Sequence, residues 1–244
     1  MKKGLIRTGV MAALLSLAAP VAASAQEIDS IYVTPRLIYS YQKGDMSAAK
    51  WRQGQWTASA LGGEETDKNL AFGLAVGTDL GYSSDWPVRV EGEYVYRNKA
   101  EFSKGPSSVT WVDGSARTAS HSFEVTAHSL MVNAFYDINT ASSLTPYIGA
   151  GLGGAYLKTD YRTSISNGGN ASIGVSKSNW GLAWNVGGGV AYHLNENAAL
   201  DFGYRYVDLG TAETGSINAL GMTGSSEVDY TAHEFSIGLR LTGF

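Results

Sequence analysis

The sequence contains no cysteine, which excludes a disulfide framework, a thiolate metal site and a lipid-modified N-terminal cysteine. Long apolar runs are missing too: after residue 25, no segment is long enough to form a membrane-spanning helix. The four histidines lie in different segments, and none has a partner at the spacing of metal ligands. We therefore expect a protein without a cofactor and without a metal site.

The first 25 residues have the three parts of a secretory signal peptide: a basic start, a short apolar run over 10–19, and Ala23-Ser24-Ala25. The apolar run is too short for the alternative, an N-terminal membrane helix. We expect cleavage between Ala25 and Gln26. The leader (1–25) holds three of the 18 basic residues and none of the 22 acids. The mature chain (26–244) would therefore carry a formal charge of −7, which argues against nucleic acid as a partner.

The mature sequence alternates with a period of two in eight segments, as β-strands with two different environments do. In one of them, Leu200, Phe202 and Tyr204 alternate with Asp201, Gly203 and Arg205. A transmembrane strand needs about 9 to 11 residues, and each segment is long enough. The expected strands lie near 31–41, 70–82, 87–98, 122–137, 145–158, 179–194, 198–208 and 231–243.

The connections between these segments are short and long in turn, as in outer-membrane barrels. Short turns fall at 83–86, 138–144 and 195–197, and long loops at 42–69, 98–121, 159–178 and 208–230. The sequence therefore predicts an all-β fold, a transmembrane eight-stranded antiparallel up-and-down barrel. Asp-Gly and Asn-Gly turn signals in the long loops predict hairpins that continue above the membrane. An extra hairpin within 42–69 would instead make ten strands.

The polar face of the strands decides which side lies inside. A soluble barrel of the lipocalin type would also have one apolar face, pointing inward. Here the polar face is rich in glycine and its charges balance, which favours a crowded, enclosed interior. All its bases are arginines, which pair with carboxylates in a fixed geometry. The expected lumen network consists of Arg36, Arg89, Arg97, Arg205, Arg240, Asp79, Glu91, Glu93, Asp201 and Glu234.

Aromatic residues near both ends of the strands are typical of the two interfaces of a bilayer. Those expected at the short-turn end are Tyr82, Trp86, Tyr136, Tyr147, Tyr192 and Phe244. Those expected toward the loops are Tyr39, Tyr41, Tyr96, Tyr156 and Trp180.

Catalytic and calcium-binding patterns are weak. The pairs His121-Ser122 and His128-Ser129 place neighbours on opposite faces of a strand, where a base cannot reach its nucleophile. Glu124 and Thr126 do share a face with His128, but we expect no enzyme. Calcium held by the last long loop is less favoured than a solvated acidic loop; its acids are Asp208, Glu213, Glu227 and Asp229.

Three stretches carry a resemblance to a known family: AALDFGYRYVDLG (198–210), TPYIGAGLGGAYLKTD (145–160) and HSLMVNAFYDI (128–138). The chain resembles the opacity-protein-like, eight-stranded porin-family surface antigens of Gram-negative bacteria. This resemblance implies a place in the outer membrane after export through the periplasm. It also implies contact with outer-membrane lipids and lipopolysaccharide, and recognition of the terminal Phe244 by the barrel-assembly machinery.

Two functions remain open. The first is a non-enzymatic surface protein whose long loops serve adhesion, host or surface contact, or envelope integrity. The second is a small porin that passes ions or small solutes along the lumen charges. Eight strands leave an interior that side chains can fill, which favours a plug over an ion path. A third function, lipid A modification, would require a His–Ser–acid cluster on one outward surface.

Overall fold

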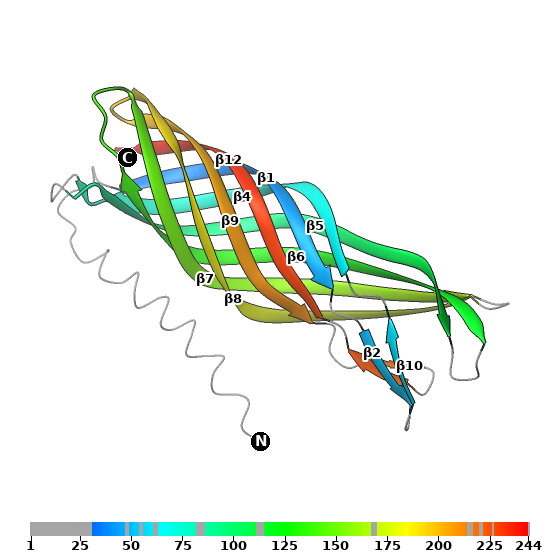
Figure 1. Cartoon of the computed structure of the whole chain (residues 1–244). Helices are drawn as coiled ribbons and strands as arrows, with labels where there is room; N and C mark the ends of the chain where they lie inside the picture. Colours follow the sequence, from blue (N-terminus) through cyan, green and yellow to red (C-terminus); the bar gives the residue numbers. More distant parts are fainter. Residues whose placement is uncertain are drawn as a thin grey trace, which may run out of the picture.

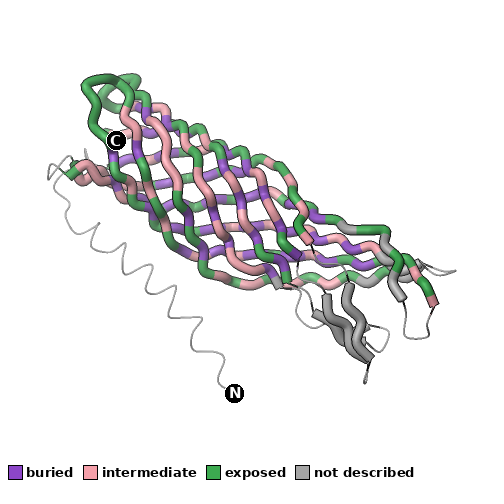
Figure 2. Tube along the Cα trace, viewed as in Figure 1, coloured by how far each residue is buried: buried purple, intermediate pink, exposed green. Residues whose placement is uncertain are grey.

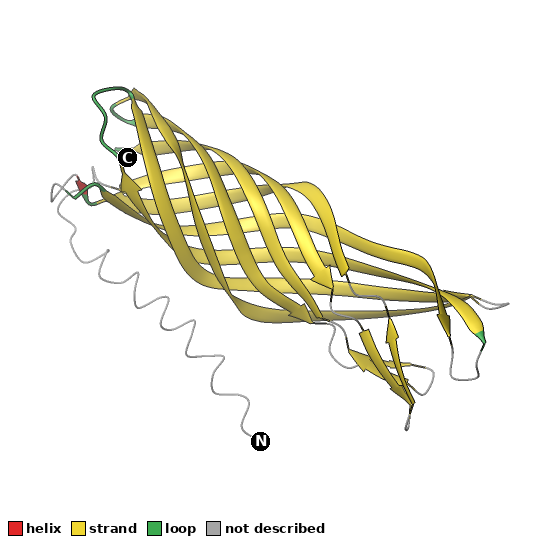
Figure 3. Ribbon diagram, viewed as in Figure 1, coloured by secondary structure: helices red, strands yellow, loops and turns green. Residues whose placement is uncertain are grey.

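Eight long strands close into a single antiparallel barrel (Figures 1 and 3). The computed structural model describes residues 31–46, 49–53, 56–60, 63–81, 86–110, 115–166, 170–213, 217–219, 222–225 and 227–243. The predicted signal peptide and Phe244 lie outside these residues. No helix in the described part is long and apolar enough to cross a membrane.

The barrel strands follow one another around the wall in chain order, which is an up-and-down topology. They are β1 (Ile31–Met46), β4 (Gly63–Asp79), β5 (Val88–Thr110), β6 (Ala116–Asp137), β7 (Leu144–Ser166), β8 (Asn170–Asn195), β9 (Ala198–Glu213) and β12 (Glu227–Thr242). Strand β12 pairs with β1 and closes the barrel. The predicted eight-stranded barrel is therefore confirmed.

In the half of the barrel nearer the short turns, the outer wall is apolar and the interior is polar. Phe72 and Leu74 point outward and are 53% and 52% exposed, whereas Arg89 and Glu93 point inward and are 1% and 0% exposed. Figure 2 shows buried and more exposed residues alternating along the strands of the wall. Lipid therefore surrounds an apolar wall, and closure of the barrel satisfies the backbone hydrogen bonds that lipid cannot.

Four strands extend well beyond the segments that the sequence indicates. Strand β7 continues to Ser166 and β8 begins at Asn170, and their ladder persists to the pair Ser166 and Asn170. Strands β5 and β6 also continue past the expected boundary, to Thr110 and from Ala116. These extensions are rich in Ser, Thr and Gly, so they lack the apolar contrast that marks a membrane strand. The expected hairpins above the membrane are present.

The polarity of the wall reverses in these extensions. Phe102 and Phe123 point inward and are buried, whereas Glu101, Glu124 and Lys158 lie on the outer side. An irregularity in the pairing between Arg97 and Ala100 shifts the inward–outward alternation of β5 by one residue. Both Arg97 and Phe102 therefore face inward. The apolar interior begins at the membrane level, where Met131 lies opposite Glu93, and continues into the extensions. It comprises Met46, Ala100, Phe102, Phe123, Val125, Ala127, Met131, Ala155, Leu157, Tyr161, Ala183, Val207, Leu209, Ala212, Val228 and Tyr230. Above the membrane the protein is thus a water-exposed barrel with an apolar core.

Two of the long connections form a separate four-stranded sheet beyond the barrel rim (Figure 1). It consists of β10 (Ile217–Ala219), β11 (Met222–Ser225), β2 (Ala49–Gln53) and β3 (Trp56–Ala60), in that order. The hairpin considered as an alternative within 42–69 is present, but β2 pairs with β11 and β3 and not with the barrel wall. The barrel keeps eight strands.

Inward glycines let neighbouring strands fill the narrow lumen. A Cβ atom on Gly187 would lie 2.7 Å from Cβ and 2.8 Å from Cα of Arg205, and closer still to the Tyr204 carbonyl oxygen. The outward Gly92 differs, because its nearest atom, the Val76 carbonyl oxygen, would be 4.0 Å away.

We expect Gly187→Val to lower the free energy of unfolding by about 3 kcal/mol or to prevent folding, because the new atoms overlap fixed neighbours. The matched substitution Gly92→Val is expected to change it by no more than about 0.5 kcal/mol. Urea unfolding in lipid vesicles, followed by tryptophan fluorescence, measures both. Similar losses for the two variants would contradict this account of the glycines.

Candidate functional site

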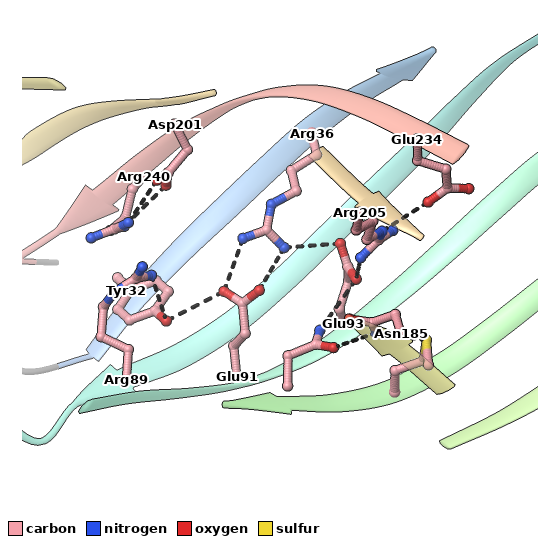
Figure 4. A network of polar contacts seen from close by, with 12 residues as sticks. Tyr32, Arg36, Arg89, Glu91, Glu93, Asn185, Asp201, Arg205, Glu234 and Arg240 are labelled. Carbon is pink, nitrogen blue, oxygen red and sulfur yellow. Dashed lines mark hydrogen bonds and ion pairs between the residues drawn. The ribbon is translucent and has the colours of Figure 1, made fainter. Parts of the chain in front are cut away.

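A network of ion pairs fills the lumen at the level of the membrane (Figure 4). Its side chains come mainly from β1, β5, β9 and β12, whose alternation directs every second residue inward. All the predicted members except Asp79 take part in ion pairs.

The centre of the network links strands on opposite sides of the barrel. Arg36 Nη1 lies 2.6 Å from Glu91 Oε1 and 2.9 Å from Glu93 Oε1. Arg205 on β9 lies four strands around the wall from Glu93 on β5, and it pairs with Glu93 from the opposite side of the lumen. Arg205 also pairs with Glu234, with 2.8 Å between Arg205 Nε and Glu234 Oε2. Arg97 Nε lies 2.7 Å from the other oxygen of Glu234. The chain of contacts therefore crosses the full width of the lumen.

Two further pairs lie nearer the short turns. Arg240 Nη2 is 2.7 Å from Asp201 Oδ1, and Arg89 Nε is 2.6 Å from Asp137 Oδ2. The Tyr32 hydroxyl donates to Glu91 over 3.3 Å and accepts from Arg89 Nη1 over 3.5 Å. Tyr32 thus connects Arg89 to the central ion pairs.

Asp79 is the exception among the predicted residues. Its Oδ1 accepts the backbone N–H of Gly81 at 2.9 Å, and it takes part in no ion pair within the described residues. Asp79 is the last residue of β4, at the short-turn end of the barrel, so its carboxylate accepts a hydrogen bond from the start of the turn and not from a lumen arginine. Asp137 supplies the acid instead. The sequence pattern places Asp137 on the same strand face as Asn133, so its inward orientation could have been predicted.

Three other polar residues complete the interior, and none of them was among the residues expected in the lumen network. Asn185 Nδ2 donates to Asn133 Oδ1 over 2.8 Å, and Asn133 Nδ2 donates to Glu93 over 3.3 Å. Tyr147, expected in the aromatic girdle, is instead buried in the lumen with its ring 5.1 Å from the guanidinium of Arg89. Its odd position on β7, beside the inward Gly149, explains this orientation.

Side chains occupy the lumen at two levels within the described part of the chain. The ion-pair network occupies the membrane level, and the apolar interior of the extensions lies directly above it. Phe102, Leu157 and Leu209 are fully buried there. At the junction, the Tyr230 hydroxyl donates to Gln42, and Gln42 donates to Asn69 over 2.7 Å. A water-filled path would have to cross both layers.

The candidate catalytic residues do not converge. His121 points inward and Ser122 outward, while His128 points outward and Ser129 is buried and accepts from Arg97 over 2.8 Å. Glu124 pairs with Lys99, and the hydrogen bond at His128 Nδ1 goes to the Tyr94 hydroxyl rather than to Thr126. These contacts place no nucleophile beside a base.

His121 is part of the apolar core above the membrane. Its Nδ1 lies 2.6 Å from the Tyr161 hydroxyl. Burial lowers the pKa of the His121 imidazole and raises the pKa of Tyr161 to about 12. Both side chains are therefore neutral at pH 7, as an apolar core requires.

The acids proposed for calcium do not form a metal site in the described residues. Asp208 Oδ1 accepts the N–H of Gly210 over 2.8 Å, and Asp229 accepts the Thr211 hydroxyl over 2.7 Å. No three His, Asp or Glu side chains of the described part come together in an arrangement that holds a metal ion.

The apolar outer wall, closed strand ladder and charged interior define a barrel protein of the outer membrane. The chain matches the family model "Outer membrane protein beta-barrel domain" over residues 10–242. It belongs to this family and is an integral outer-membrane protein.

Relatives share the outer-membrane location. Outer membrane protein PagN of Salmonella typhimurium is 28% identical over 174 residues, covering 68% of this chain and 70% of PagN. An outer membrane protein of Gluconacetobacter diazotrophicus is 27% identical over 252 residues, covering 96% of this chain and 63% of that protein. The crystal structure of Neisserial surface protein A aligns with a TM-score of 0.45 and 21% identity, covering 87% of this chain and 97% of that one.

We expect Glu234→Gln to lower the free energy of unfolding by about 3 kcal/mol, because it leaves two buried arginines short of a counter-charge. The control is Glu64→Gln, which breaks an exposed pair with Lys43 (2.7 Å between Nζ and Oε1) and is expected to cost less than about 1 kcal/mol. Urea unfolding in vesicles compares them. Equal losses would show that the lumen pairs are no more important than surface pairs.

Proposed function

We propose that this protein is a non-enzymatic surface protein whose extracellular part mediates adhesion, host or surface contact, or envelope integrity. The filled lumen is the observation that carries the proposal. The ion-pair network and the apolar interior lie in series in the lumen and oppose the passage of solutes, so we place the function in what the barrel displays outside. Recognition of Phe244 by the assembly machinery and the absence of catalysis are parts of the same proposal.

The display is extensive. Strand β8 has 26 residues and β7 has 23, whereas about 9 to 11 suffice to cross a membrane. On the other side of the rim, the β10-β11-β2-β3 sheet joins two connections that are far apart in the sequence. Rigid strands thus hold the loop regions at a distance from the lipid, as a binding surface on a scaffold requires.

The porin alternative makes an opposite prediction in a planar bilayer. We expect the purified wild type to show no steady channels, because two filled layers lie in series. The single variants Arg205→Ala and Glu93→Ala are expected to stay silent as well, since the apolar interior above remains closed. Steady channels in the wild type, altered by either substitution, would establish a porin and overturn the proposal.

Loop replacement tests adhesion directly. Short turns replace 47–62 and 214–226, so that the β10-β11-β2-β3 sheet is removed while the eight barrel strands remain. We expect cells that express this variant to lose most of their attachment to epithelial cells or abiotic surfaces, because the displayed sheet is gone.

The control shortens the tip of the β7–β8 hairpin by a similar number of residues. Equal surface levels and heat-modifiable gel mobility would verify that each variant inserts and folds. Unchanged attachment in both variants, together with unchanged resistance to detergents, would contradict a function of the extracellular part.

A further inference from the structure

Two matching constellations lie on the outer wall, on opposite sides of the barrel. In the first, the Tyr94 hydroxyl lies 2.7 Å from His128 Nδ1, and the Tyr96 ring centroid is 5.1 Å from that of His128. In the second, the Tyr204 hydroxyl lies 2.8 Å from His233 Nδ1, and the Tyr206 ring centroid is 5.3 Å from that of His233.

The third strand of each constellation matches as well. His128 is directly opposite Tyr156 on β7, and His233 is directly opposite Tyr41 on β1. One row further from the short turns, Thr126 lies opposite Lys158 in the strand register, and Thr231 lies opposite Lys43. The sequence repeats the unit as well, as TAHSL at 126–130 and TAHEF at 231–235. Because β5-β6-β7 and β9-β12-β1 are four strands apart around an eight-stranded wall, a pseudo-twofold axis relates them.

The level of the two constellations is that of the lipid headgroups. Outward residues below them are apolar, such as Leu130 and Phe235, which are 52% and 55% exposed. Outward residues above them are acidic: Glu124 pairs in register with Asp160, and Asp229 with Asp45. The Thr–Lys rows therefore lie between acyl chains and a pair of carboxylates.

Each constellation presents three polar groups toward this level: an imidazole, a hydroxyl and an ammonium. The hydrogen bonds described for the two imidazoles involve Nδ1, which leaves Nε2 available. The hydroxyl of Thr126 or Thr231 and the ammonium of Lys158 or Lys43 lie in the next row on the same face. Diagonal neighbours on paired strands are about 7 to 8 Å apart, so a histidine and a lysine can hold one anion between them.

We infer that each constellation binds a phosphate group of an outer-leaflet lipid headgroup. Imidazole, hydroxyl and ammonium donors are suited to phosphate oxygens, and an ammonium gives the stronger, charge-assisted bond. The aromatic row below lies against the acyl end of the lipid, and the acidic row above bounds the site on its water-exposed side. The inference rests on the position of the barrel in the membrane and is independent of adhesion.

The two sites differ in one respect. Lys158 is exposed and has no ion pair within the described part of the chain, whereas Lys43 Nζ lies 2.7 Å from Glu64 Oε1. The charges around the first site are Lys99, Glu101, Glu124 and Asp160, and those around the second are Lys68, Asp45, Glu64, Asp208 and Asp229. The first site should therefore bind more tightly.

The test uses the refolded full-length mature protein in a nonionic detergent at pH 7.5. Native mass spectrometry counts bound lipid A in its diphosphorylated and dephosphorylated forms. We expect two bound copies of the phosphorylated form. Each double variant, His128→Gln with Lys158→Gln or His233→Gln with Lys43→Gln, is expected to weaken one site roughly tenfold or more. The control, His193→Gln, removes a histidine near the short-turn end of β8, away from both constellations, and should keep both copies.

Histidine side-chain NMR identifies the sites independently. Phosphorylated lipid A should shift the ¹⁵N signals of His128 and His233 and leave those of His121 and His193 unchanged. Equal binding of dephosphorylated lipid A, or equal loss in the control, would overturn the inference. Saturation of the same shifts by inorganic phosphate at the lipid's concentration would also overturn it, because the site would then bind a free anion and not a headgroup. Heat-modifiable gel mobility confirms that every variant is folded.

Discussion

The structure depends on one constraint: each barrel strand separates two media, and the outer medium changes along its length. Within the membrane, lipid requires an apolar outer wall, so the polar residues must lie inside. Above the membrane, water surrounds the wall, and the apolar residues move inside. A strand such as β6 keeps one alternation throughout, with Leu130 and Glu124 on the outer face and Asn133 and Phe123 on the inner face. What reverses between the two halves is the polarity of the residues on each face.

Burying charges in the membrane half is costly unless every charge is paired. The lumen meets this requirement with pairs of arginines and carboxylates, some from neighbouring strands and some from strands that are not neighbours. Arg205 and Glu93 come from opposite walls, and Arg97 reaches Glu234 on β12 from β5. Such pairs form only when all the strands stand in the correct register. The network therefore ties the strands to one register, and it leaves little room for solutes.

Much of the fold was predictable because the membrane half has strong alternation. The eight strands, the inward face and most of the charged residues follow from period-two patterns around Leu74, Val132 and Phe202. The extensions were harder to predict. Their outer faces carry Ser and Thr, and their inner faces mix Val125 with Thr159, so neither face stands out. Asp79 and Tyr147 show a second limit, because a residue near a turn can cap that turn or enter the lumen, and its type alone does not decide.

The contact between Arg205 and Glu93 has a mechanical consequence. A thin cylinder under uneven lateral pressure from the surrounding lipid deforms by flattening into an oval. A tie across the diameter resists this distortion far better than added thickness in the wall. Arg36, Arg97 and Glu234 brace the same cross-section from other angles. The protein can therefore hold its outer strands at fixed positions while the surrounding lipids are compressed or sheared.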